Sequence, residues 1–184
     1  MSKRIALLSA VAFSALALTS TFTAPARAEE KTVMVGGAAM FPSRNIIQNA
    51  VNSKDHTTLV AAVKAAGLVD TLEGKGPFTV FAPTNAAFGK LPAGTVDNLV
   101  KPENKATLTK ILTYHVVPGK LEASDLSDGK KLKTVEGEEL VVKRANGKVM
   151  IVDAKGGTAS VTISNVNQSN GVIHVVDSVL MPAS

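Results

Sequence analysis

The hydrophobic period changes part-way along the chain, and this change constrains the fold more than any other feature. In the first half, apolar residues recur at helical spacing, as Leu59, Val63 and Ala66 do before the helix stop at Gly67. From Leu140 onward, runs rich in valine and isoleucine alternate with tight turns. Helices followed by strands predict an α+β domain rather than a series of βαβ units.

One strand-like segment interrupts the helical half. Phe78 to Phe81 is expected to be a strand with Phe78 and Val80 on one face. Pro83 is expected to end this strand, and Thr84 can cap the short helix that follows. Other helices are predicted to begin at polar residues that can cap them: Ser43, Asp55 and Thr95.

Two Asn-Gly pairs mark turns in the second half. Asn146-Gly147 lies between two β-rich runs, which predicts a two-residue hairpin turn with positive φ at both positions. Asn170-Gly171 predicts another tight turn before the last β-rich run. These turns make the second half a series of antiparallel strands.

The N-terminus has the pattern of a secretory signal peptide. A basic segment (2–4) precedes an apolar run (5–26), and Ala-Arg-Ala at 26–28 is a cleavage pattern. A retained membrane anchor is the alternative, which the polar residues inside the run and the cleavage pattern disfavour. We therefore expect an exported protein, periplasmic or secreted, with no retained membrane span. An extended arm or linker is expected at 29–44, and one domain at 45–182.

The positive charge of the chain comes mainly from this leader. The sequence has 20 basic and 15 acidic residues, and loss of Lys3, Arg4 and Arg27 leaves 17 basic residues and a net charge of +2. Aromatic residues make up 4% of the chain and Trp is absent, so few side chains could stack on bases. A nucleic-acid partner is therefore not expected.

The residue types needed for catalysis are mostly missing. The chain has no cysteine, which excludes disulfides, thiolate metal sites and cysteine nucleophiles. No G-x-S-x-G, P-loop, G-x-G-x-x-G or H-E-x-x-H motif occurs. The adjacent Glu138 and Glu139 would point to opposite faces of a strand and could not easily share a proton. We therefore predict a domain stabilised by burial, which is not an enzyme and has no cofactor.

The three histidines are the remaining candidates for chemistry. His56 lies at a predicted helix start, where we expect it to be exposed. His174 has β-branched neighbours, which is typical of a partly buried, hydrogen-bonded structural histidine. A metal site built from His115, His174 and Asp177 is the alternative, although no short ligand spacing supports it. A catalytic triad with His174 and Asp177 is disfavoured because the two residues fall on opposite faces of a strand.

Three stretches resemble the signature regions of fasciclin-like domains. FTVFAPTNAAF, at residues 78–88, is similar to the first signature box, and SNGVIHVVDSVLMP, at 169–182, is similar to the second. Between them, Tyr114-His115 in ILTYHVVPG resembles the Tyr-His motif of the family. The three stretches occur in the family order, and the resemblance covers about residues 45–182. It is closest to bacterial single-domain exported members.

The resemblance implies a wedge-shaped β-sandwich with several helices packed against it. It also implies a role in adhesion or surface interaction, without established catalysis. In animal relatives the Tyr-His region is implicated in integrin contact, so Tyr114 and His115 are the candidate interaction residues. The alternative is that both rings pack in the core. Some animal members carry Asn-Lys-Asp-Ile-Leu before the second box; here the segment 165–168 reads Asn-Val-Asn-Gln, so integrin recognition through it is not expected.

Three functions can be ranked from these observations. The leading hypothesis is an exported interaction module for adhesion or for association with a surface or host, whose partner is a surface protein, a polysaccharide or a second copy of the chain. The alternative is a carrier of an apolar ligand such as a carotenoid or lipid, as the resemblance to algal relatives implies. Met34, Met40 and Phe41 of the arm could then cover the ligand. A metal-dependent enzyme using His115 or His174 ranks last.

Overall fold

The computed structural model describes residues 31–183, so the leader predicted at residues 1–28 lies outside the described part of the chain. Most helices lie in the first half and most strands in the second, which confirms the α+β class. None of the helices within residues 31–183 is long and apolar enough to cross a membrane.

The helices are short, and all of them precede residue 115. They are α1 (Ile46–Ala50), α2 (Thr57–Ala66), α3 (Val69–Glu73), α4 (Asn85–Gly89), α5 (Thr95–Leu99) and α6 (Lys105–Tyr114), with 3₁₀ turns η1 (Lys54–His56) and η2 (Pro102–Asn104). The strands are β1 (Val33–Val35), β2 (Ala38–Met40), β3 (Phe78–Pro83), β4 (Val116–Pro118), β5 (Lys131–Lys133), β6 (Glu139–Ala145), β7 (Lys148–Val152), β8 (Thr158–Gln168) and β9 (Gly171–Val176).

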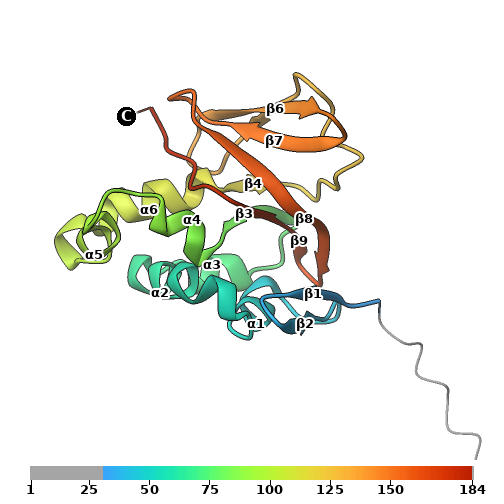
Figure 1. The fold of residues 1–184 in the computed structure, drawn as a ribbon. Coiled ribbons are helices and arrows are strands. Elements are labelled where there is room, and N and C mark those ends of the chain that lie inside the picture. Colours follow the sequence, from blue (N-terminus) through green and yellow to red (C-terminus); the bar gives the residue numbers. More distant parts are fainter. Residues whose placement is uncertain (1–30, 184) are drawn as a thin grey trace, which may run out of the picture.

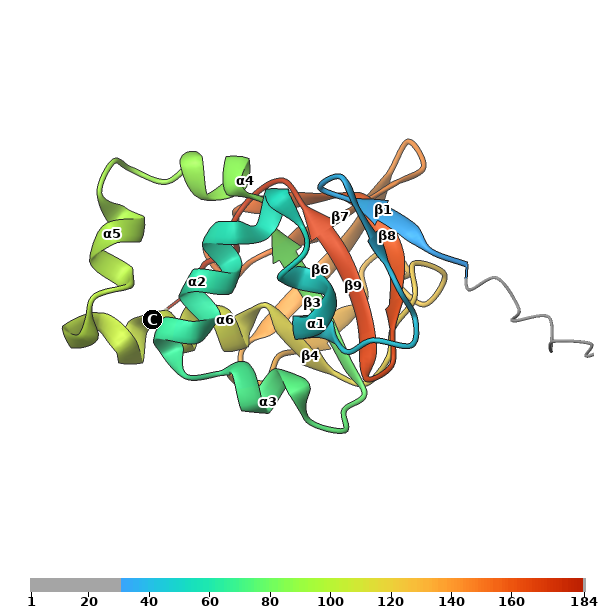
Figure 2. The same ribbon diagram turned by 90° about the horizontal axis from the view of Figure 1, so that it is seen from below.

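Seven of the strands form one strongly curved sheet in the order β4-β3-β9-β8-β7-β6-β5. The turn after β5 returns to β4, where the Val135 N–H donates to the Val116 carbonyl at 2.8 Å, so the sheet is nearly closed. Figure 1 shows the helices gathered on one side of β3 and β9, with β6 and β7 on the far side of the molecule. In Figure 2 the small β1–β2 hairpin lies beside β8.

Two hydrophobic clusters give the molecule three layers. The first cluster fills the space between the helices and strands β3, β8 and β9 and includes Leu59, Leu112 and Ile173. The second lies inside the curved sheet and includes Phe81 and Ile151. Strand β3 supplies both clusters by alternation, with Val80 on the helical side and Phe81 inside the sheet, as its sequence pattern predicts. Helices therefore cover one side of a two-layered sheet, as the fasciclin resemblance implied.

The pairing of β3 with β9 is the one parallel pair in the large sheet, and the sequence pattern did not predict it. Phe78 pairs with Gly171 and Pro83 with Val176, across more than ninety residues of chain. Every residue of β9 is buried, because helices cover one face and the second sheet layer covers the other. A strand that is buried on both faces needs an unbroken apolar run, which explains the valine-rich sequence.

The N-terminal segment is not the extended arm that the sequence suggested. Residues 33–40 form a β-hairpin, and Gly36 and Gly37 turn it with positive φ angles of 56° and 77°. Val35 and Met40 are 4% and 2% exposed and belong to the first hydrophobic cluster. The arm interpretation failed because both three-residue strands, Val-Met-Val and Ala-Ala-Met, are apolar throughout, so no alternation marks their buried face.

The turn before β9 also differs from the expectation. Gln168 pairs with Gly171, so Ser169 and Asn170 form the turn, and neither Asn170 nor Gly171 has positive φ. Glycine is needed at 171 for space, because a Cβ atom there would lie 2.0 Å from the Phe78 carbonyl oxygen. By contrast, Asn146 and Gly147 have φ angles of 51° and 74°, which confirms the other predicted hairpin turn.

The helix starts are only partly those predicted. Thr84 caps α4 by accepting a hydrogen bond from the Ala87 N–H at 3.2 Å, as expected. Asn45 rather than Ser43 caps α1, in a reciprocal capping box with Gln48. Asp55 lies within η1 and Thr95 is already helical, so neither is a capping residue.

Candidate functional site

The Tyr-His pair lies where α6 ends and β4 begins. Tyr114 is the last residue of α6, and His115 is the residue that caps its C-terminus. Tyr114 has no exposed surface and His115 is 2% exposed, so both rings are in the core. Neither candidate interaction residue lies on the surface of the folded chain, and the core-packing alternative describes both.

Tyr114 connects strand β6 to the turn after β7 in the second sheet layer. Its hydroxyl accepts a hydrogen bond from the Ala154 N–H at 2.9 Å and donates one to the Glu139 carbonyl at 3.3 Å. Burial raises the pKa of Tyr114, so the hydroxyl keeps its proton. The ring fills part of the second cluster while the hydroxyl joins β6 to the turn after β7.

His115 ties the C-terminal segment to α6. Its Nδ1 atom donates to the Ile111 carbonyl at 2.8 Å, and its Nε2 atom accepts from the Leu180 N–H at 2.9 Å. These partners fix the neutral tautomer with the proton on Nδ1. Burial lowers the pKa of His115 to about 4, which keeps the imidazole neutral at physiological pH.

His174 has a similar bridging position in β9. Its ring stacks on Phe81 with ring centroids 5.7 Å apart. Its Nε2 atom donates to the Leu121 carbonyl at 2.7 Å, and Nδ1 accepts a long, 3.4 Å hydrogen bond from Asn165. Burial lowers the pKa of His174 as well. This is the buried structural role that its β-branched neighbours indicated.

The prediction that His56 is exposed is wrong. His56 is 3% exposed, and its Nδ1 atom lies 2.8 Å from the Ser53 hydroxyl. Burial lowers the pKa of His56, and the nearby Ala82 carbonyl and Asp55 carboxylate offset this only in part. A signal was present in the sequence, because His56, Leu59 and Val63 have the spacing of one helical face and the last two are core residues.

The Ser53–His56 contact does not make a catalytic pair. A hydroxyl within hydrogen-bond reach of an imidazole is the contact that activates a serine nucleophile. Here both residues are buried, and His56 Nε2 has no hydrogen-bond partner of normal geometry in the described chain. No carboxylate therefore orients the imidazole, and water has no direct route to the hydroxyl.

The side chains considered for a metal site, His115, His174 and Asp177, already bond to other groups of the chain. Both ring nitrogens of His115 and of His174 bond to the backbone, and the Asp177 carboxylate accepts from the Ser160 N–H at 2.8 Å. Lys90 Nζ lies 3.7 Å from the same carboxylate. Residues 31–183 contain no group of three or more histidine or acidic side chains that could hold a metal ion.

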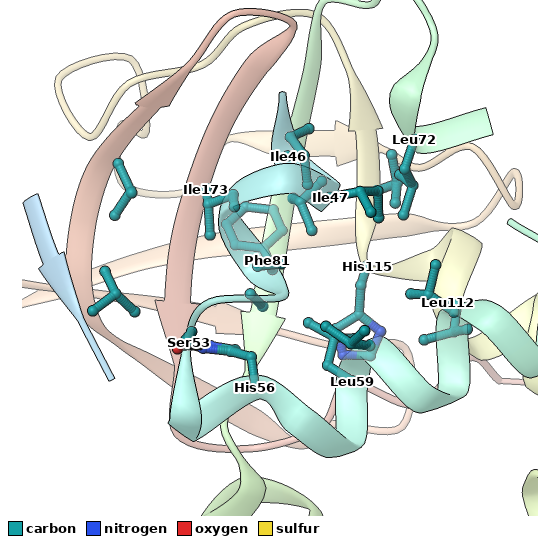
Figure 3. A pocket seen from close by; sticks show the side chains of 18 of the residues that line it. Ile46, Ile47, Ser53, His56, Leu59, Leu72, Phe81, Leu112, His115 and Ile173 are labelled. Carbon is teal, nitrogen blue, oxygen red and sulfur yellow. Dashed lines mark hydrogen bonds between the residues drawn. The ribbon is translucent and has the colours of Figure 1, made fainter. Parts of the chain in front are cut away.

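An apolar cavity of about 40 Å³ lies between the helices and the sheet (Figure 3). The β1–β2 hairpin and α1 cover one side of it, α2 and α6 form another, and β3 and β9 form the floor. Its polar lining consists of Ser53, His56 and His115, and Figure 3 shows Ser53 and His56 side by side at one end. The lining can contact a hydrocarbon but offers no charged group to a ligand.

Asn170, which the sequence predicts only as a turn residue, also has a structural role through its side chain. Its side chain is buried, accepts from the Ile46 N–H at 3.1 Å, and donates to the carbonyls of Leu72 at 2.6 Å and Gly74 at 2.9 Å. These bonds join the second signature box to the start of α1 and the end of α3. The box therefore organises the fold rather than presenting a surface.

A sequence model of the fasciclin domain matches residues 54–182. The chain belongs to the fasciclin domain family. This confirms the resemblance seen in the two signature boxes and the Tyr-His motif.

This fasciclin protein is similar in sequence to two relatives described here and similar in fold to one solved structure. It is 46% identical over 179 residues to Protein sll1483 of Synechocystis sp., covering 97% of this chain and 96% of that one. It is 39% identical over 153 residues to the cell surface glycolipoprotein MPB83 of Mycobacterium bovis, covering 80% of this chain and 64% of the glycolipoprotein. A FAS1 domain pair from the insect cell adhesion molecule Fasciclin I has the same fold, with a TM-score of 0.68 over 77% of this chain and 52% of that one. Because the two sequences are only 20% identical, this similarity supports a shared fold and nothing about function.

Proposed function

We propose that this fasciclin protein is an exported, non-catalytic interaction module that mediates cell adhesion or association with a surface or host. The observation that carries the proposal is membership of a family whose mycobacterial relative is named a cell surface glycolipoprotein. The structure adds that the family motifs are buried and hydrogen-bonded, which leaves the outer surface as the part available for function. A surface protein, a polysaccharide or a second copy of the chain could serve as the partner.

Deletion of the gene in the native host tests this function. Cells without the protein should attach to their usual surface or host less well, and a plasmid copy should restore attachment. Unchanged attachment in every such assay would contradict the proposal. Export is tested separately: the protein recovered outside the cytoplasm should begin at Glu29, and a product that retains Met1 would contradict removal of the leader.

The apolar cavity favours a second candidate function, the carriage of an apolar ligand such as a carotenoid or lipid. At about 40 Å³ the cavity is far smaller than the ~150 Å³ cavity known to admit benzene. A long ligand would therefore require the β1–β2 hairpin and α1 to move away from the sheet. Protein purified from the native host should then carry a visible absorption band or an extractable lipid, and a colourless, lipid-free product would rule this candidate out.

A further inference from the structure

Strands β6 and β7 lie on the side of the molecule away from the helices (Figure 1), and β5 continues their sheet beside β6. Alternate residues of these strands point into the second cluster, and Leu132, Val142 and Ile151 are examples. The residues between them point outward. The outer face is defined by these residues: Lys131, Lys133, Glu139, Val141, Lys143, Ala145, Lys148, Met150 and Val152.

The strand register places the lysines of this face along one line. Lys133 and Lys131 are two residues apart on β5, so they lie about 7 Å apart on the same face. Lys131 pairs with Val141, so Lys143 on β6 is its diagonal neighbour. Lys143 pairs with Met150, so Lys148 is diagonal in turn. Diagonal neighbours are about 7–8 Å apart, so the four lysine positions follow one line across three strands.

The positive charge of this line is neutralised only in part by carboxylates of the same face. Glu139 is the single carboxylate of the outer face, and it lies 3.3 Å from Lys131 Nζ. The other acidic side chains of this stretch are used elsewhere. Glu136 faces Lys110 at 3.5 Å, Glu138 accepts from the Ala183 N–H, and the buried Asp153 accepts from the N–H groups of Lys155, Gly157 and Met181. Four lysines and one glutamate give the outer face a net charge of +3.

The side-chain types of the outer face favour one class of anionic partner over others. Protein interfaces are rich in aromatic side chains and arginine and poor in lysine, whereas the positive charges here are all lysine. Membrane-surface binding uses inserted Trp, Phe or Leu, and nucleic-acid strands use aromatic stacking; the outer face has neither. Val141, Met150 and Val152 are half-buried and lie between the charged side chains. Lysine ammonium groups are hydrated point charges, and a line of them suits a hydrated polymer with spaced carboxylates.

We propose that the outer face of β5–β7 binds the carboxylate groups of an acidic polysaccharide. The proposal rests on the interaction function above and names the surface and the class of partner. The four lysines supply the attraction, and the half-exposed aliphatic side chains between them contact the sugar rings. The attraction is between solvent-exposed charges, so it weakens as salt is added.

Binding of the processed protein to polygalacturonate tests this directly. One variant replaces the four lysines of the outer face with glutamine (K131Q, K133Q, K143Q and K148Q). The matched control removes four exposed lysines from the helical side (K54Q, K64Q, K75Q and K101Q), which changes the net charge equally. The outer-face variant should lose at least about tenfold in affinity at low salt, as expected for four exposed ion pairs, and the control should stay within about twofold.

Several outcomes would overturn the proposal. Equal losses in the two variants would show that net charge alone attracts the polymer. Preferential binding to phosphatidylglycerol vesicles or to DNA would assign the face to another partner.

A fallback covers the case in which the fourfold variant does not fold, as judged by circular dichroism. The double variants K131Q/K133Q and K143Q/K148Q are then measured instead, and each should lose about threefold in affinity.

The same variants separate this proposal from the function on which it rests. If deletion of the gene leaves attachment unchanged, the interaction function fails. If deletion abolishes attachment and the outer-face variant restores it fully, the function stands and the assignment to the outer face is wrong.

Discussion

His115 and His174 each join segments that are distant in the sequence, and burial favours the neutral form of all three buried histidines. His115 links α6 to Leu180, and His174 links β9 to Leu121. His56 lies against Ser53 at the entry to α2. Because burial lowers all three pKa values, a proton on any of these rings is bound more readily in the unfolded chain than in the folded one.

Stability should therefore fall as the pH is lowered through the range in which only unfolded histidine is protonated. For His115 this range runs from about 6.5 down to about 4, and the stabilisation present above it is lost within it. The free energy of unfolding, measured with denaturant, should decrease by about 3 kcal/mol from this residue alone, with losses of the same sign from His56 and His174.

The variant H115Q separates this effect from carboxylate titration. It should be less stable at neutral pH, but its stability should depend less steeply on pH between 6.5 and 4 than that of the natural protein. Identical pH dependence in the two proteins would show that His115 titrates normally.

Replacing Tyr114 with phenylalanine tests whether that hydroxyl serves the core or a partner. The change keeps the ring and leaves the Ala154 N–H without its acceptor, so it should cost about 1 kcal/mol or somewhat more in unfolding free energy. Attachment below the melting temperature should be unchanged. A folded Y114F protein that no longer supports attachment would restore Tyr114 as an interaction residue.

At the scale of elements, the N-terminal hairpin is the clearest departure from the sequence-based expectation. Its two methionines provide an internal comparison, because Met40 is 2% exposed and Met34 is 60% exposed. Met40→Ala should destabilise the protein by about 2–5 kcal/mol, whereas Met34→Ala should change stability by less than about 0.5 kcal/mol. Denaturant unfolding measures both. Equal, small effects would mean that the hairpin is an arm after all.

The parallel β3–β9 pair depends on the missing side chain of Gly171. A Cβ atom at that position meets the carbonyl oxygen of Phe78, which is backbone and cannot rotate away. Gly171→Ala should therefore cost at least about 3 kcal/mol. The control is Gly89→Ala at the end of α4, where no atom lies within 4 Å of the added Cβ, and stability should change by less than about 1 kcal/mol. Similar melting temperatures for the two variants would contradict this account of β3 and β9.

Local patterns predicted most of the elements, with the N-terminal hairpin as an exception, but not how distant elements meet. The helix stop at Gly67, the cap at Thr84 and the turn at Asn146 are set by neighbouring residues, and the structure has all three. The parallel β3–β9 pair and the bonds of Asn170 to α1 and α3 join segments about ninety or more residues apart, so no local period records them. The histidines were hardest to place, because burial of a polar ring depends on what covers it.

At the scale of the whole molecule, the interior accounts for the fold, and we propose that the exterior accounts for contact with a partner. The signature boxes and the Tyr-His motif supply core packing and buried hydrogen bonds, so they account for the fold that the family shares. The exposed lysines of β5–β7 contribute little to stability because exposed charge pairs are weak. Changes inside should therefore alter stability, and changes on the outer face should alter contact with a partner.

The most direct test of whether the outer face, and not the interior, contacts the partner is an attachment assay on the deletion strain. The strain is complemented in parallel with three forms of the gene. The natural protein and the interior variant Y114F should both restore attachment, and the outer-face variant lacking its four lysines should not, although all three are exported in equal amounts. Normal attachment by the uncomplemented strain would contradict the claim that this fasciclin protein acts by surface contact.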